Sequence, residues 1–135
     1  MPTSTTERLA SALLALEGVA LLVVAGIEVV ALVTGDAADV GSSIALIVLT
    51  AIGAIAVLAF AVATARGQSW GRSGGIVTQL LMLAVAFGAI TGPAPSPGFA
   101  LATAAPAIVG LALLIAAARR AGARARSVDD DAPAG

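Results

Sequence analysis

Four long apolar runs, separated by short polar segments, make up most of the chain. They cover residues 9–33, 42–65, 75–91 and 99–118. At about 1.5 Å of rise per residue, the first run measures about 37 Å as a helix, which is enough to cross a hydrocarbon core of about 30 Å. The pattern predicts an all-α membrane protein, an antiparallel bundle of four transmembrane helices, because helices satisfy their own backbone hydrogen bonds in lipid.

The segments between the runs carry turn-forming and helix-breaking residues. Glycine and aspartate dominate 35–39, and residues 66–74 read as a basic, glycine-rich hairpin. Three prolines in 92–98 remove backbone donors, so this segment is expected to be an extended turn. Pro106 lies inside the fourth run, where it predicts a kinked helix.

Two polar ends flank the predicted membrane domain, which spans 9–118. Residues 1–8 form a short polar N-terminal segment, and 119–135 form a tail that is basic and then acidic. The composition of this tail predicts disorder. Its basic half is expected to lie against anionic lipid headgroups through Arg119, Arg120, Arg124 and Arg126.

The basic residues predict an orientation. All seven are arginines, and they lie in the N-terminal segment, the 66–74 hairpin and the tail. Four crossings place these segments on one side, and the positive-inside rule identifies that side as the cytoplasm. We therefore expect a multi-pass plasma-membrane protein with both termini cytoplasmic and with Trp70 as an anchor at the inner interface.

The composition disfavours most enzyme and ligand chemistry. Hydrophobic residues make up 59% of the chain and charged residues 11%, far from a soluble domain. With neither Cys nor His, the chain lacks thiolates, the commonest metal ligand and the usual general base. One Trp and no Tyr offer little for stacking on nucleic acid. We expect no enzyme, cofactor, metal site or nucleic-acid partner.

Two carboxylates interrupt the first apolar run. Glu17 and Glu28 are eleven residues apart, close to three helical turns, so both lie along one stripe. A carboxylate near the bilayer centre costs several kcal/mol unless it is paired or hydrated, so the stripe should face a protein interior.

Polar residues on other runs lie at matching depths. Counting ~1.5 Å per residue puts Glu17 ~12 Å and Gln79 ~7 Å from the inner surface, with Thr78 beside it, so Glu17 and Gln79 could meet. Arg72 could also reach Glu17 along its aliphatic stem and pair with it. Near the outer side, comparable depths suggest a second polar layer that contains Glu28, Thr50 and Thr103.

Rows of small residues indicate where helices could pack closely. One row lies on the third run, at Ala84, Gly88 and Gly92. The other follows alternating spacings of three and four on the second run, through Ser42, Ala45, Leu49, Ile52, Ala56, Ala59 and Ala63.

Short stretches of the chain resemble a known group of proteins. The stretch Arg66–Arg72, the run Ile76–Leu81 and Leu16-Glu17-Gly18 are similar to small four-span membrane proteins found widely in actinobacteria, and the alanine-rich, lysine-free composition agrees with a high-GC genome. The resemblance implies the topology of four spans and no particular chemistry.

Small multidrug-resistance exporters offer a second comparison. They also have four spans and a membrane-embedded glutamate in the first, so by analogy Glu17 would bind drug and proton in turn. Those exporters surround their glutamate with aromatic residues, whereas this chain has no Tyr and places its single Trp in a predicted loop.

Two functional hypotheses follow from the sequence. In the first, the embedded carboxylates are hydrogen-bonded groups that fix helix register, and the protein is a non-enzymatic accessory subunit or homo-oligomer acting through helix contacts. In the second, Glu17 exchanges protons, and the protein is a proton-coupled small transporter or channel with Gln79 and Arg72 in support.

Overall fold

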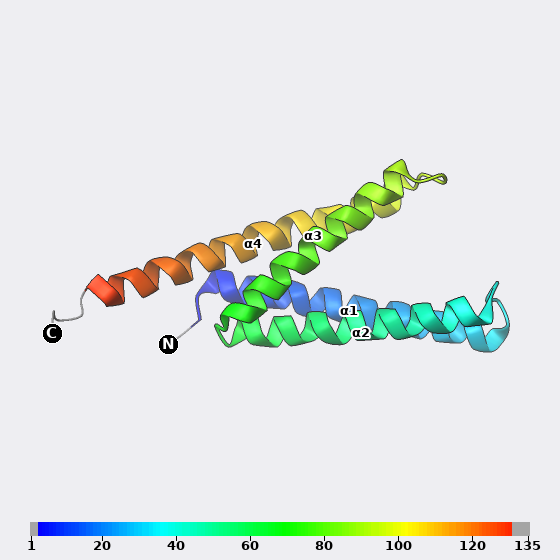
Figure 1. Ribbon diagram of the computed structural model, residues 1–135, viewed down its shortest axis with the longest axis horizontal. Helices are drawn as coiled ribbons and strands as arrows, with labels where there is room; N and C mark the ends of the chain where they lie inside the picture. Colours follow the sequence, from blue (N-terminus) through cyan, green and yellow to red (C-terminus); the bar gives the residue numbers. More distant parts are fainter. Residues whose placement is uncertain (1–2, 131–135) are drawn as a thin grey trace.

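The computed structural model describes residues 3–130, and this part of the chain contains four helices and no strand (Figure 1). The helices are α1 (Thr5–Thr34), α2 (Val40–Ala65), α3 (Ser69–Thr91) and α4 (Pro97–Asp130). All four are long and apolar enough to cross a membrane. The predicted class, an all-helical protein with four membrane-length helices, is therefore confirmed.

The helices form two antiparallel hairpins, α1–α2 and α3–α4 (Figure 1). The hairpins pack against each other at the end where α1 begins and α2 turns into α3, which we call the closed end. From there they diverge toward the end that holds the turns at 35–39 and 92–96, which we call the open end (Figure 1). The structure thus differs from the predicted bundle, since its four helices are packed together at one end only.

Side-chain caps explain why α1 and α2 begin before their apolar runs. Ser4 and Glu7 form a capping box, in which the Ser4 backbone N–H donates to Glu7 Oε2 at 2.7 Å. At the start of α2, the Ser42 backbone N–H donates to Asp39 Oδ2 at 2.7 Å, and this hydrogen bond holds the pKa of the Asp39 carboxyl below its usual value. Gly35, at φ 81°, ends α1 in the left-handed conformation that glycine tolerates best.

The start of α3 departs from the predicted hairpin at 66–74. Only Arg66–Gln68 connect α2 to α3, and Gly71 and Gly75 are buried within α3. A Cβ on Gly71 would lie 2.6 Å from the Thr64 backbone nitrogen, and one on Gly75 would lie 2.9 Å from Leu114 Cδ1. These glycines therefore allow α3 to approach α2 and α4 closely, and Gly71, predicted within the 66–74 hairpin, serves packing rather than chain reversal.

The end of α4 also differs from the prediction. The helix continues beyond 118 to Asp130, so residues 119–130 are helical where we expected disorder. Alanine and arginine, which fill much of this segment, are both strong helix formers. The remaining residues of the predicted tail, 131–135, lie outside the described part of the chain. The helix also runs through Pro106.

The core lies toward the closed end and contains a compact apolar cluster. Its buried members come from α1, α2 and α4: Ala10, Leu14, Val57, Ala61 and Leu114. Neither predicted row of small residues forms this core. Of the α2 row only Ala63 is buried, and on α3 both Ala84 and Gly88 are exposed. In an alanine-rich helix several rows have the right spacing, and contact with the larger Leu14 and Leu114 decides which one is buried.

Candidate functional site

A buried hydrogen bond joins α1 to α3 within the core. Gln79 Nε2 donates to Glu17 Oε2 at 2.7 Å, and the two residues are 0% and 8% exposed. The structure thus brings together the two side chains whose depths suggested a contact. Because both are polar and withdrawn from the surroundings, this bond fixes the rotation of α1 relative to α3.

Two glycines shape the space around the pair. A Cβ on Gly110 of α4 would lie 2.8 Å from Gln79 Cδ, so the Gln79 amide occupies room that this glycine leaves. A Cβ on Gly18 would lie 2.7 Å from Leu58 Cδ2, which brings α2 close to α1 beside Glu17. All four helices therefore position the pair. Sequence reasoning missed Gly110, because its partner is known only once α4 is placed on α3.

The pair leaves two acceptors without a donor. Glu17 Oε1 and Gln79 Oε1 are both buried and have no hydrogen-bond partner. An ionised carboxylate and an amide oxygen can only accept, so neither can satisfy the other. A proton on Glu17 would turn one of its oxygens into a donor.

Arg72 does not contact Glu17, and the predicted ion pair between them is wrong. Its Nη1 atom donates to the Gly67 carbonyl at 2.8 Å and to Glu7 Oε1 at 3.4 Å. The reason is the early start of α3, which places Arg72 in the first turns of the helix, level with Glu7. Glu17 lies ten residues, about 15 Å, further along α1.

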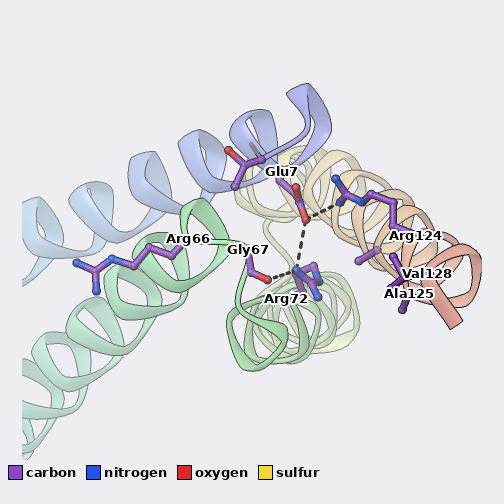
Figure 2. Close-up of a pocket in the computed structure, with 9 residues that line it drawn as sticks. Glu7, Arg66, Gly67, Arg72, Arg124, Ala125 and Val128 are labelled. Carbon is purple, nitrogen blue, oxygen red and sulfur yellow. Dashed lines mark hydrogen bonds and ion pairs between the residues drawn. The ribbon is translucent and has the colours of Figure 1, made fainter. Parts of the chain in front are cut away.

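Glu7 is the centre of a second polar cluster, at the closed end. Its Oε1 atom also accepts from Arg124 Nη2 at 3.2 Å, and its side chain is 3% exposed (Figure 2). Ion pairs to Arg72 and Arg124 tie α1 to α3 and α4. The Ser4-x-x-Glu7 spacing of a capping box could have revealed the helix start. The link to Arg124, 117 residues away, depends on the fold.

The expected outer polar layer is not formed. Glu28 is half-buried and its Oε2 atom has no partner, while Thr103 donates to the Phe99 carbonyl of its own helix at 2.9 Å. No hydrogen bond links Glu28, Thr50 and Thr103 to one another. Thr103 lies on the α3–α4 hairpin, which diverges from α1–α2 toward the open end (Figure 1), whereas Glu28 and Thr50 share the α1–α2 hairpin and still do not bond. Similar depth on separate helices does not suffice when the helices are apart.

The remaining predicted residues lie at the surface or bond within their own helix. Thr78 donates to the Gly74 carbonyl at 3.0 Å. Trp70 is 51% exposed, donates to Gln68 Oε1 at 3.1 Å, and packs edge-on against Phe60 with 5.9 Å between ring centroids. All four tail arginines are exposed, and one of them, Arg124, also pairs with Glu7; the four are Arg119, Arg120, Arg124 and Arg126. Within residues 3–130, no cluster of three or more acidic, His or Cys side chains could hold a metal ion.

Comparison with protein-family models, with curated proteins and with solved structures returned no match for this chain. The functional argument therefore depends on the fold and on the two polar clusters.

Proposed function

We propose that this chain is a small non-enzymatic membrane protein that acts through helix contacts, as an accessory subunit or a homo-oligomer. The observation that carries the proposal is the divergence of the two hairpins toward the open end (Figure 1). Toward this end apolar side chains such as Phe87 of α3, 69% exposed, are not covered by the other hairpin and must be covered by lipid or by another protein. The embedded Glu17–Gln79 hydrogen bond supports the same function, since it holds the closed end in one register.

The surface of α3 toward the open end is suited to such a contact. Ala84 and Gly88 are exposed, and nothing lies within 4 Å of a Cβ placed on Gly88. Small residues let membrane helices approach closely enough for van der Waals contact and Cα–H hydrogen bonds. Exposed Phe87 adds area for packing beside them.

The proposal includes a location and an orientation. The arginine-bearing segments meet at the closed end, and the positive-inside rule then favours a cytoplasmic closed end in the plasma membrane. In this orientation Trp70 anchors the inner interface, and the exposed tail arginines lie near anionic headgroups: Arg119, Arg120, Arg124 and Arg126. Membership of the small four-span actinobacterial proteins stays a prediction from sequence.

Cysteine crosslinking in native membranes tests the helix-contact function. The chain contains no Cys, so Gly88→Cys provides a single reactive site on the proposed contact face. We expect oxidation to give a disulfide dimer or, with a reagent that carries a maleimide and a photoreactive group, an adduct with a partner. Ser127→Cys, on the exposed end of α4, is the matched control and should give much less product. Monomer alone for Gly88→Cys would count against the proposal.

A second candidate function is proton-coupled transport or conduction through Glu17. The observation that favours it is the buried Glu17 carboxyl with one unpartnered oxygen. In proteoliposomes, Glu17→Gln should abolish pH-dependent flux, because its amide cannot exchange a proton at neutral pH. Thr78→Val removes a nearby hydroxyl bonded only within α3 and should preserve flux. Unchanged flux for Glu17→Gln would exclude this function.

A further inference from the structure

A cleft of about 390 Å³ opens at the closed end, beside the Glu7 cluster (Figure 2). It is bounded by the first turn of α1, the α2–α3 connection, the start of α3 and the last turns of α4. Its volume falls in the range of about 300–1,000 Å³ that small-molecule sites occupy. The cleft is separate from the Glu17–Gln79 pair and from the open end, so any role of this cleft is independent of the proposed function.

The charges that line this cleft are unbalanced. Three arginines line it, Arg66, Arg72 and Arg124, but only one carboxylate, Glu7. The Arg66 guanidinium points away from Glu7, so the inner cluster consists of two cations and one anion (Figure 2). One further negative charge would bring this inner cluster to neutrality.

The single negative charge of Glu7 cannot neutralise both arginines, and both of its carboxylate oxygens already accept hydrogen bonds. Its Oε1 atom accepts from Arg72 and Arg124, and its Oε2 atom accepts from the Ser4 backbone N–H and hydroxyl. Its side chain is 3% exposed, so it is fixed on all sides. The carboxylate therefore holds the guanidinium groups of Arg72 and Arg124 next to each other at the edge of the cleft.

Within residues 3–130, most N–H groups of the two guanidiniums have no hydrogen-bond partner; the Arg124 side chain is 49% exposed and that of Arg72 12%. Each guanidinium has five N–H donors. Arg72 uses only Nη1, toward Glu7 and Gly67, and Arg124 uses only Nη2, toward Glu7. Among residues 3–130, no other acceptor is hydrogen-bonded to either group. Two oriented guanidiniums with unused N–H pairs match the oxygens of a phosphate, which arginine binds in a bidentate manner.

A neighbouring cleft adds further hydrogen-bond donors beside Arg72. It has a volume of about 370 Å³ and shares Arg72, Ala121 and Ala125 with the first, and the hydroxyl-bearing Ser69 and Ser73 of α3 also line it. Gln68, which precedes α3, makes no side-chain cap to the first turn, so backbone N–H groups there also lack a capping partner. Arg72 lines both clefts, so its guanidinium can donate a hydrogen bond to a phosphate oxygen in either one.

We propose that this cleft binds a phosphate-bearing anion between Arg72 and Arg124. The anion is either the headgroup of an anionic lipid or a soluble phosphate compound, since both present the same oxygens. The alanine and valine side chains of α4 in the wall, at Ala121, Ala125 and Val128, give the cleft an apolar side next to its cationic one. A phosphodiester, with one negative charge, neutralises the inner cluster.

Ligand-dependent stabilisation of the full chain in nanodiscs tests the proposal. In phosphatidylcholine discs, inorganic phosphate is added and the thermal midpoint is measured, with sodium chloride at equal ionic strength as the control. A rise in the midpoint in this arm indicates binding of a soluble phosphate. Discs that contain phosphatidylglycerol report a lipid headgroup. A ligand that binds only the folded chain raises its thermal midpoint, so a rise in either arm supports the site and identifies the source.

Two variants separate the cleft from general charge attraction. Arg124→Lys keeps the charge opposite Glu7 but loses the planar guanidinium, and it should weaken the binding by about tenfold or more. Arg126→Gln removes an exposed arginine of the same helix that does not line the cleft, and it should leave binding unchanged. No midpoint rise in either arm, or equal loss of binding in both variants, would overturn the proposal.

Discussion

At the scale of single residues, the central feature is the hydrogen bond between Glu17 and Gln79. Both residues could be selected from sequence, because a carboxylate and an amide in apolar helices need a partner and lie at similar depths. The competing pairing of Glu17 with Arg72 looked equally available. The early start of α3, which places Arg72 beside the Glu7 carboxylate, decides between them and becomes visible only with the fold.

Removing the amide of this pair should destabilise the protein. Gln79→Leu leaves the buried Glu17 carboxyl without its only hydrogen bond, and we expect a loss of about 1–3 kcal/mol in the free energy of unfolding. Thr78→Val, at the neighbouring position, should change stability by less than about 1 kcal/mol. Reversible unfolding in mixed micelles measures both, and equal stability of the two variants would contradict the assigned role of Gln79.

Filling the space beside Gln79 should also lower the free energy of unfolding. A methyl group at Gly110 would collide with the Gln79 amide, so Gly110→Ala should cost about 1–3 kcal/mol. Gly122→Ala, also in α4, meets nothing within 4 Å and should be neutral or stabilising by up to about 1 kcal/mol through helix propensity. The same unfolding measurement compares them, and a stable Gly110→Ala protein would show that the amide is free to move.

At the scale of the helices, the apolar runs predicted number, type and approximate position, while the boundaries followed from local chemistry. The capping box extends α1 to Thr5, and α3 begins at Ser69 because Gly71, predicted to lie in the 66–74 hairpin, is a packing residue of the helix. A glycine-rich segment fits either interpretation until its neighbour is known. The positions of Gly71 against α2 and Gly75 against α4 decide in favour of packing.

Two glycines of α3 should therefore respond differently to substitution. Gly71→Ala places a methyl group 2.6 Å from the Thr64 backbone nitrogen, so α3 must move away from α2, at a cost of about 1–3 kcal/mol. Gly88→Ala has open space and should be neutral or slightly stabilising. Thermal midpoints of both variants in detergent provide the test. A midpoint for Gly71→Ala at or above that of the unmodified chain would show that this close approach is dispensable.

At the scale of the whole molecule, the four-span topology could be predicted, but the divergence of the hairpins could not. Hydropathy does not encode the angle between helix pairs. Because surfaces that face lipid and surfaces that face another helix are both apolar, a closed and an open arrangement have the same hydropathy pattern. The absence of the outer polar layer has the same origin, since Glu28 and Thr103 lie on different hairpins.

The proposed orientation can be tested with single cysteines. We expect a membrane-impermeant maleimide to label Ser96→Cys, in the turn at the open end, on intact cells. Ser127→Cys, at the closed end, should react only after permeabilisation. The reverse pattern would place both termini outside and remove the basis for a cytoplasmic arginine cluster.

The central claim is that Glu17 is a fixed contact in the closed end of a protein that works through its helix surfaces. The most direct measurement is an infrared titration of the Glu17 carboxyl in nanodiscs, with Glu17→Gln as the control that identifies its band. The account predicts one unchanged protonation state across the accessible pH range. A transition between about pH 6 and 8 would contradict it, because such a group is poised for proton exchange and would favour transport.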